Sequence, residues 1–355
     1  MWSNTKFTRG LGIDLPIVQG PFGGKISSVE LTSTVSNAGC LGSFGCQPYH
    51  ANEIVDIVNQ IKNKTKNKFN LNLWVNDRDE SISDFSQYDF DKVIKLLEPY
   101  FEAANIKPPT FPKDLGPQFE DQIEAVFSCR PAIISFVYGI PNTDILLKCK
   151  QLNITTIGTA TTLDEAIAIE NAGMDMVVAT GTDAGGHRVS FLQESQDSLV
   201  GTFSLIPQVA DHVKIPIIAA GGIVDARGVK AAFELGADAV QIGTAFLATK
   251  QSGTTNLHRE KLFSKEARYT TLTKIFSGRL SRGMRSKLTD QLNEFEKYMA
   301  PYPIQSKIMS ALGAYQNNSE KSAEFKSFWA GQAAPLLKFK DANELIKSIV
   351  LNMGS

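Results

Sequence analysis

The stretch "IPIIAAGGIVDARGVKAAFELGADAVQIGTAF", residues 215–246, joins two short apolar runs through an amphipathic helical pattern. Both runs are continuously apolar rather than alternating, which is typical of strands buried on both faces of a parallel sheet. The helical pattern begins after Asp225, a residue type that caps helices, and ends at Gly236, a residue type that terminates them. The stretch therefore predicts a strand, a crossover helix and a second, parallel strand.

The same unit recurs through the first two thirds of the chain. Thr161 or Thr162 is expected to cap another crossover helix that begins near Leu163. Six further apolar runs occur at residues 16–20, 39–45, 69–74, 132–139, 154–160 and 174–181. Eight repeats favour a closed barrel, because a doubly wound sheet more often stops at about five or six strands. We therefore predict an α/β protein with a (β/α)₈ TIM barrel over residues 1–249.

Two segments are too long to be simple crossovers. Residues 76–128 must hold an insertion, in which "KPPTFPKDLGP" (107–117) separates two helical segments and is a candidate loop over the barrel mouth. After the eighth strand, residues 250–340 predict a mostly helical lid or substrate domain. Residues 341–355 predict a C-terminal helix that returns to the barrel.

Composition narrows the classes of partner. The chain has 36 Lys and Arg against 37 Asp and Glu, so no general attraction to nucleic acid or to a membrane surface is expected. Its four cysteines lack the spacing of zinc ligands, which predicts free thiols and no metal site. The sequence shows no secretory signal pattern and no apolar stretch of membrane-spanning length. We expect a cytoplasmic protein that acts on a small molecule, and a homodimer is an open possibility.

The ends of four predicted strands are rich in glycine. The loops are "QGPFGG" (19–24), "GTDAGGHR" (181–188), "AAGGI" (219–223) and "IGTAF" (242–246). The active sites of TIM barrels lie at this end of the strands, and glycine leaves amide N–H groups uncovered for anions. Gly221, Gly222, Gly243 and Thr244 stand where barrel enzymes often bind phosphate. A single such glycine usually forms a turn, but four loops on one rim favour a phosphorylated cofactor.

His187 is one of four histidines and lies in the second of these loops. A histidine on a glycine loop at the barrel mouth can exchange protons near neutral pH, which predicts a catalytic role. The alternative is a histidine hydrogen-bonded for structural reasons. Asp183 and Arg188 are candidates to orient His187, and solvent-facing positions are the alternative for both.

Five motifs, taken in order, resemble the nitronate monooxygenase family, formerly called 2-nitropropane dioxygenases, over nearly the whole chain. They are "GPFGG" (20–24), "TDAGGHR" (182–188), "IPIIAAGGIVDARG" (215–228), "GADAVQIGTAF" (236–246) and "SGRLSRGMRS" (277–286). The resemblance implies FMN bound on a (β/α)₈ barrel and covered by a small helical domain. It also implies the oxidation of nitronates, with neutral nitroalkanes as a further substrate class, by O₂ to a carbonyl compound and nitrite.

The resemblance implies roles for individual residues as well. His187 matches the catalytic histidine, and its pKa is expected near the working pH. Tyr298, Tyr302 and Lys307 are expected to face the substrate, with a surface position as the alternative for Lys307. Arg279 would support the phosphate or pair with an acid. The implied FMN-binding residues are Gly20, Pro21, Phe22, Gly23, Asn72, Gly185, Gly186, Gly221, Gly222, Gln241, Gly243, Thr244 and Gln332.

One departure and three rival interpretations remain. Some bacterial members have "SFHFG" in the fourth-strand motif, whereas this chain has "SFVYG" (135–139), with Val137 in place of the histidine. The substrate preference is therefore open. The rivals are an FMN-dependent enoyl reductase of fatty-acid synthesis that uses NAD(P)H, and a flavin-binding regulatory protein without turnover. An IMP dehydrogenase-like barrel is disfavoured because it needs a cysteine after strand six, and residues 150–355 contain none.

Overall fold

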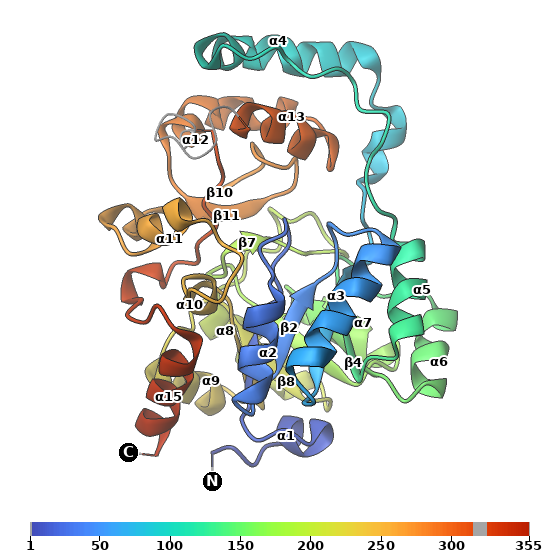
Figure 1. Ribbon diagram of the computed structural model, residues 1–355, viewed down its shortest axis with the longest axis vertical. Coiled ribbons are helices and arrows are strands. Elements are labelled where there is room, and N and C mark those ends of the chain that lie inside the picture. Colours follow the sequence, from blue (N-terminus) through green and yellow to red (C-terminus); the bar gives the residue numbers. More distant parts are fainter. Residues whose placement is uncertain (1, 315–324, 355) are drawn as a thin grey trace.

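The computed structural model describes residues 2–314 and 325–354 and has eight parallel strands in a nearly closed barrel (Figure 1). Their order is β1-β9-β8-β6-β5-β4-β3-β2, and a parallel bridge between Val18 and Leu41 joins the two edge strands. The strands are β1 (Ile17–Gln19), β2 (Gly42–Gly45), β3 (Phe69–Trp74), β4 (Ile133–Val137), β5 (Thr155–Ala160), β6 (Met176–Thr180), β8 (Ile217–Ala220) and β9 (Ala239–Ile242). All eight predicted strands are confirmed, although the last run ends earlier than expected because Thr244 begins a short helix.

The lower end of the barrel is closed by its own N-terminal helix, α1 (Lys6–Leu11). Phe7 and Leu11 of this helix are buried against side chains inside the barrel, among them Val18 and Ile157. Every residue of β3 and of β4 is buried, as expected for strands covered on both faces. Only the opposite end of the barrel, where the strands end, is left for a site.

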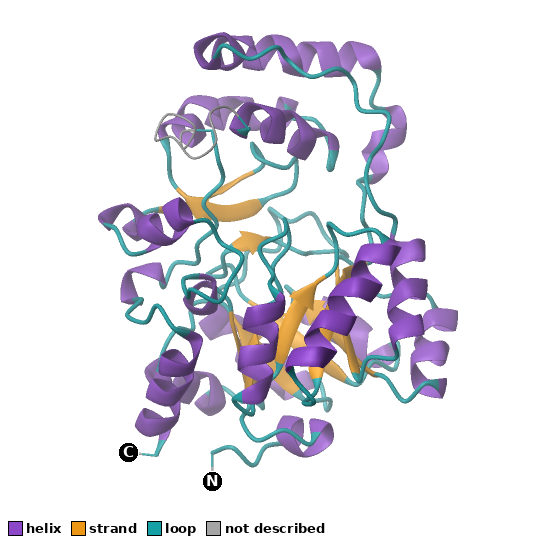
Figure 2. Cartoon of the chain, viewed as in Figure 1, coloured by secondary structure: helices purple, strands orange, loops and turns teal. Residues whose placement is uncertain are grey.

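Helices surround the strands, as Figure 2 shows. They are α2 (Val29–Asn37), α3 (Ala51–Lys64), α5 (Phe119–Cys129), α6 (Thr143–Gln151), α7 (Leu163–Asn171), α8 (Thr202–His212), α9 (Ala226–Glu234), α10 (Thr244–Leu247) and α15 (Ala342–Met353). Thr162 caps α7 by accepting a hydrogen bond from the Glu165 amide at 3.3 Å, and Asp225 caps α9, as predicted. Helix α15 packs against α2 and α9. Within the described part of the chain, no helix is long and apolar enough to cross a membrane.

The remaining elements lie beyond the C-terminal ends of the strands (Figure 1). They include four helices, α4 (Gln87–Ala104), α11 (Asn256–Leu262), α12 (Lys287–Leu292) and α13 (Ile304–Gly313). A three-stranded antiparallel sheet of β10 (Thr270–Thr273), β11 (Ser281–Met284) and β7 (Gly186–His187) accompanies them. We did not predict this sheet. Strand β7 has only two residues and lies inside the glycine-rich loop, so no hydrophobic pattern marks it.

The insertion after β3 divides between two cores. Helix α5 packs against α3 and is therefore one of the barrel helices. Helix α4 instead buries Phe90 and Leu97 in a second hydrophobic cluster, together with Ile304 and Ile308 of α13. The two segments that exceed the barrel period thus pack on each other, although about 200 residues separate them in the chain.

Candidate active site

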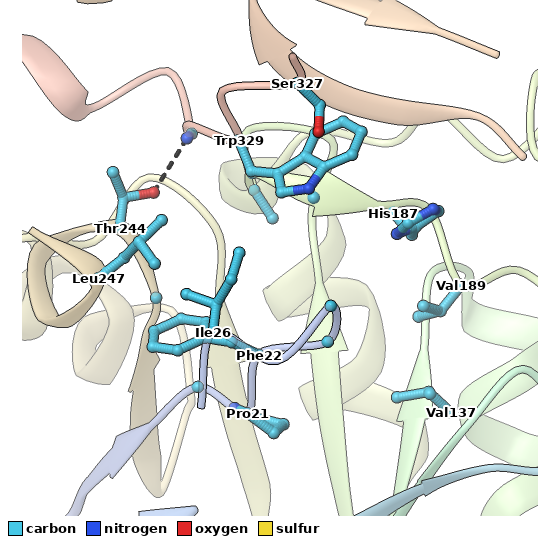
Figure 3. Close-up of a pocket in the computed structure, with 18 of the residues that line it drawn as sticks. Pro21, Phe22, Ile26, Val137, His187, Val189, Thr244, Leu247, Ser327 and Trp329 are labelled. Atoms are coloured by element: carbon cyan, nitrogen blue, oxygen red, sulfur yellow. Dashed lines mark hydrogen bonds between the residues drawn. The ribbon is translucent and has the colours of Figure 1, made fainter. Parts of the chain in front are cut away.

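One cavity of about 770 Å³ lies at the C-terminal ends of the barrel strands. Figure 3 shows His187, Val189 and Val137 along one wall, with Thr244 and Leu247 on the opposite side and Trp329 above. All four glycine-rich loops contribute to its lining, as do residues from α13 and from the segment 325–333. The loop 107–117, which we considered for the barrel mouth, supplies no residue to the lining.

The structure brings most of the predicted site residues to this cavity. His187 and Tyr302 line it, whereas Tyr298, Lys307 and Gln332 are not among the lining residues. Tyr298 is 57% exposed, and the Gln332 amide donates to the carbonyl of Asp183 at 2.9 Å. The predicted FMN-binding residues that line the cavity are Gly20, Pro21, Phe22, Gly23, Asn72, Gly185, Gly186, Gly221, Gly222, Gln241, Gly243 and Thr244.

The glycines of these loops serve two different purposes. A Cβ atom added at Gly186 or Gly243 would meet no other atom within 4 Å, so these glycines leave open space in the cavity. At Gly185 the added atom would lie 2.5 Å from the Gly331 amide, and at Gly221 it would lie 2.5 Å from Thr202 Oγ1. The first pair therefore makes room for a ligand, and the second pair makes room for the chain itself.

The additional sheet holds His187 in the cavity wall. In β7, His187 pairs with Ser281 of β11, and the next amide, that of Arg188, donates to Leu280 O at 2.8 Å. The imidazole Nε2 lies 2.9 Å from Ser277 Oγ. The rings of Trp74 and Trp329 lie 5.3 and 5.5 Å from the imidazole, measured between centroids. Residues distant in the sequence thus fix both the backbone position of His187 and the orientation of its ring.

The surroundings of His187 change its acidity. Burial first, and then the positive charge of Arg279, lower the pKa of His187 to about 3. The expectation of a pKa near the working pH is therefore wrong, and the imidazole is neutral at neutral pH. Arg279 pairs with an acid, the second alternative considered for it: its Nε lies 2.6 Å from Asp79 Oδ1, and its guanidinium stacks on Tyr138 and Tyr302.

Asp183 and Arg188 hold the loop rather than the imidazole. Arg188 is 2% exposed, and its Nη1 and Nη2 donate to Thr180 O and Ser198 O at 3.0 and 2.8 Å. Asp183 Oδ2 accepts from the Thr202 amide at 2.7 Å. Both side chains therefore form their hydrogen bonds with main-chain groups of the surrounding loops. Neither side chain forms a hydrogen bond with the His187 ring.

The floor of the cavity carries Asn70, which we did not predict, beside Asn72, which we did. Asn70 and Asn72 both donate from Nδ2 to Ser135 Oγ, at 2.8 and 3.0 Å. Asn70 Oδ1 is buried and has no hydrogen-bond partner among the described residues. Since side chains two positions apart on a strand share a face, the prediction of Asn72 as a cavity residue also implied Asn70. Ser277 and Trp329 begin two segments that carry the family resemblance, "SGRLSRGMRS" (277–286) and "WAGQ" (329–332), but no local pattern in the sequence predicted that either would lie next to His187.

The whole chain is similar to known proteins. The family model of nitronate monooxygenase matches residues 4–352. A probable nitronate monooxygenase of Staphylococcus aureus (strain MRSA252) is 37% identical over 352 residues, which cover 99% of this chain and 97% of that protein.

Solved structures agree with this match. Nitroalkane oxidase from Streptomyces ansochromogenes superposes with a TM-score of 0.87 at 28% identity, covering 98% of this chain and 97% of that one. FabK from Thermotoga maritima gives a TM-score of 0.76 at 27% identity, with coverage of 99% and 96%. The chain therefore belongs to the nitronate monooxygenase family.

Proposed function

We propose that this enzyme uses FMN and O₂ to oxidise alkyl nitronates to a carbonyl compound and nitrite. The observation that carries the proposal is the single cavity that brings His187 together with four glycine-rich strand ends. Membership of the nitronate monooxygenase family supports the reaction type.

The residues of the cavity fit FMN. Gly243 leaves open space on the side where the amides of Gly221, Gly222 and Thr244 would hold the phosphate. The partnerless acceptor Asn70 Oδ1 suits an N–H donor such as the isoalloxazine ring carries. We assign contacts with that ring to Asn72 and to the loop that begins at Gly20. When bound, FMN supplies the electron acceptor that the side chains of the protein lack.

The side chains of the cavity bind the substrate and move its proton. The neutral imidazole of His187 accepts the α-proton of a nitroalkane, because only an unprotonated nitrogen can act as a base. Trp74, Trp329 and Tyr302 exclude water around that ring. Val137 and Val189 present apolar surface to the alkyl part of the substrate.

We assign a covering role to the segment after β9. Tyr302, Met309, Phe325 and Trp329 line the cavity and all come from this segment. Their side chains are large and mostly apolar, so they would separate a bound cofactor from solvent. This is the lid function that we inferred for residues 250–340, of which 315–324 lie outside the described residues.

Oxygen uptake by the purified, FMN-loaded protein tests the proposal. With propionate 3-nitronate or with ethyl nitronate we expect saturable O₂ consumption accompanied by nitrite release. A yellow protein that consumes no O₂ with either nitronate would contradict it.

An enoyl reductase, the rival drawn from the sequence resemblance, is the second candidate, and FabK from Thermotoga maritima also superposes over nearly the full chain. Such an enzyme needs a nicotinamide to reduce its flavin. Anaerobic mixing with NADH or NADPH discriminates between the two functions. Rapid bleaching of the flavin absorbance would favour the reductase, whereas bleaching by a nitronate alone would favour our proposal.

A further inference from the structure

Ser277 lies in the turn between β10 and β11 and lines the cavity next to His187. It is 3% exposed, so solvent cannot satisfy its hydroxyl group. Three protein groups surround Oγ: His187 Nε2 at 2.9 Å, the carbonyl of Arg279 at 3.1 Å and the amide of Arg279 at 3.3 Å.

These three contacts decide which imidazole nitrogen carries the hydrogen. The Arg279 amide can only donate to Oγ, and the Arg279 carbonyl can only accept from it. The hydroxyl has a single hydrogen, and no other donor among the described residues reaches the Arg279 carbonyl. If that hydrogen went to His187 Nε2, a buried carbonyl would lose its partner, which proteins rarely tolerate. All three contacts are satisfied together only when Nε2–H of His187 donates to Oγ.

We propose that Ser277 is a positioning residue that fixes the Nε2–H tautomer of His187 and so reserves the Nδ1 lone pair for the proton of the substrate. No described residue forms a hydrogen bond with Nδ1. In the reaction, the α C–H bond of the nitroalkane breaks and its electron pair stays on the substrate, which becomes the nitronate. The proton goes to Nδ1, and the resulting imidazolium keeps its Nε2–H on Ser277 Oγ. The catalytic half of this inference rests on the proposed function, whereas the tautomer does not.

The lowered pKa of His187 agrees with this role, because a choice between tautomers exists only for the neutral ring. Strand β11, which follows this turn, provides a matched control. Ser281 is fully buried and pairs with His187 through the backbone, but its Oγ donates to the carbonyl of Thr273 at 3.1 Å and not to the imidazole.

The tautomer can be measured directly by long-range ¹H–¹⁵N correlation of the imidazole rings in FMN-loaded, ¹⁵N-histidine-labelled protein. The His187→Asn variant identifies the signals of His187. We expect the Nε2–H pattern in the wild type, in Ser277→Thr and in Ser281→Ala. In Ser277→Ala we expect a mixture of tautomers or the Nδ1–H form.

Kinetics give the second readout. Ser277→Ala should lower kcat for neutral nitroethane by roughly tenfold or more, since the wrong tautomer of a catalytic histidine blocks proton transfer. Its turnover of preformed ethyl nitronate should stay within about twofold, and Ser277→Thr should restore nitroethane turnover. An Nδ1–H pattern in the wild type, or an unchanged pattern in Ser277→Ala, would overturn the inference. A wild type with the Nε2–H pattern but no O₂ uptake would refute the proposed function and leave the tautomer assignment supported.

Discussion

His187 combines a fixed position with an unusual acidity. Its backbone belongs to a two-residue strand, its ring is packed between tryptophans, and its Nε2 faces a buried hydroxyl. Burial and the charge of Arg279 disfavour the imidazolium form. The imidazole is therefore unprotonated before the substrate binds and has a lone pair free for a proton, while the negative charge that develops on the substrate would offset the charge of Arg279 and stabilise the imidazolium.

Replacing the imidazole should separate two classes of substrate. In His187→Asn we expect kcat/KM for neutral nitroethane to fall by roughly 10²- to 10⁴-fold, the usual contribution of a general base. Preformed ethyl nitronate needs no proton abstraction and should lose much less. O₂ uptake measures both rates, and His212→Asn, on the exposed end of α8, is the control. An equal loss on the two substrates would refute the role of base.

The pH profile follows from the lowered pKa. Because the pKa of His187 is about 3, the base is mostly unprotonated above about pH 4, and kcat/KM for nitroethane should show little loss from its protonation down to that pH. Arg279→Met removes the positive charge that helps to lower this pKa. In that variant we expect the acidic limb of the profile to move to higher pH. Arg285→Met, a change at an exposed arginine, should leave the limb in place.

Among the elements, helix α11 and the segment after residue 324 meet through a second buried histidine. His258 is 5% exposed and donates from Nε2 to the carbonyl of Trp329 at 2.9 Å. Burial lowers the pKa of His258 to about 4, against an ordinary value of 6.5. The hydrogen bond to the Trp329 carbonyl favours the charged ring, but the burial of that charge outweighs it, so protonation of His258 should cost stability.

Stability should depend on pH through this histidine. Between about pH 6.5 and pH 4 the unfolded chain binds a proton at His258 that the folded chain does not, so stability is lost as the pH falls through this window. The full difference corresponds to about 3 kcal/mol at about 1.4 kcal/mol per pKa unit. Urea unfolding at pH 7 and pH 4 should show a smaller difference for His258→Gln than for His212→Gln. Equal differences for the two variants would contradict the assignment.

The loop after β9 makes a separate prediction about the cofactor. A side chain at Gly243 would project into open space, and its φ of −97° suits any residue. In Gly243→Val we therefore expect the free energy of unfolding of the apoprotein to change by less than about 1 kcal/mol. The affinity for FMN, measured by quenching of flavin fluorescence, should fall at least roughly tenfold, because the isopropyl group occupies ligand space. Gly354→Val, far from the cavity, should bind FMN normally.

In the molecule as a whole, the described residues form two large hydrophobic cores and three smaller clusters. The larger core joins strands and helices of the barrel, and the second joins α4 with α12, α13 and the residues around Phe276. Because the cavity lies between the barrel and α13, the second core supports one wall of the site. A substitution in the second core, at a residue that does not line the cavity, should therefore still loosen the wall that α13 contributes to the site.

Leu97→Ala tests this connection. Leu97 is fully buried in the second core, so truncation should cost about 2–5 kcal/mol of stability. Hydrogen exchange should then show faster opening of α4 and α13 than of the barrel strands. Leu351→Ala, at a position 76% exposed on α15, should change neither. Uniform acceleration over the whole chain would show that the two cores unfold as one.

The sequence alone determined the barrel and the location of its site. The signals that predicted the barrel are local: continuous apolar runs, Thr162 and Asp225 at helix starts, and glycine at strand ends. Each of them affects the conformation of residues only a few positions away in the sequence. Parallel strands bring their carboxyl ends together, so the sequence alone predicts that His187 and the glycines lie on one rim of the barrel.

Only the tertiary structure decided the chemistry at His187 and the arrangement above the barrel. Arg279, Ser277 and Trp329 act on an imidazole about 90 to 140 residues away in the chain. Strand β7 is defined by its pairing with β11. Helix α4 lies away from the barrel because its apolar face packs against α13. A pKa, a tautomer and a short strand are products of through-space contacts, which no local pattern of residues records.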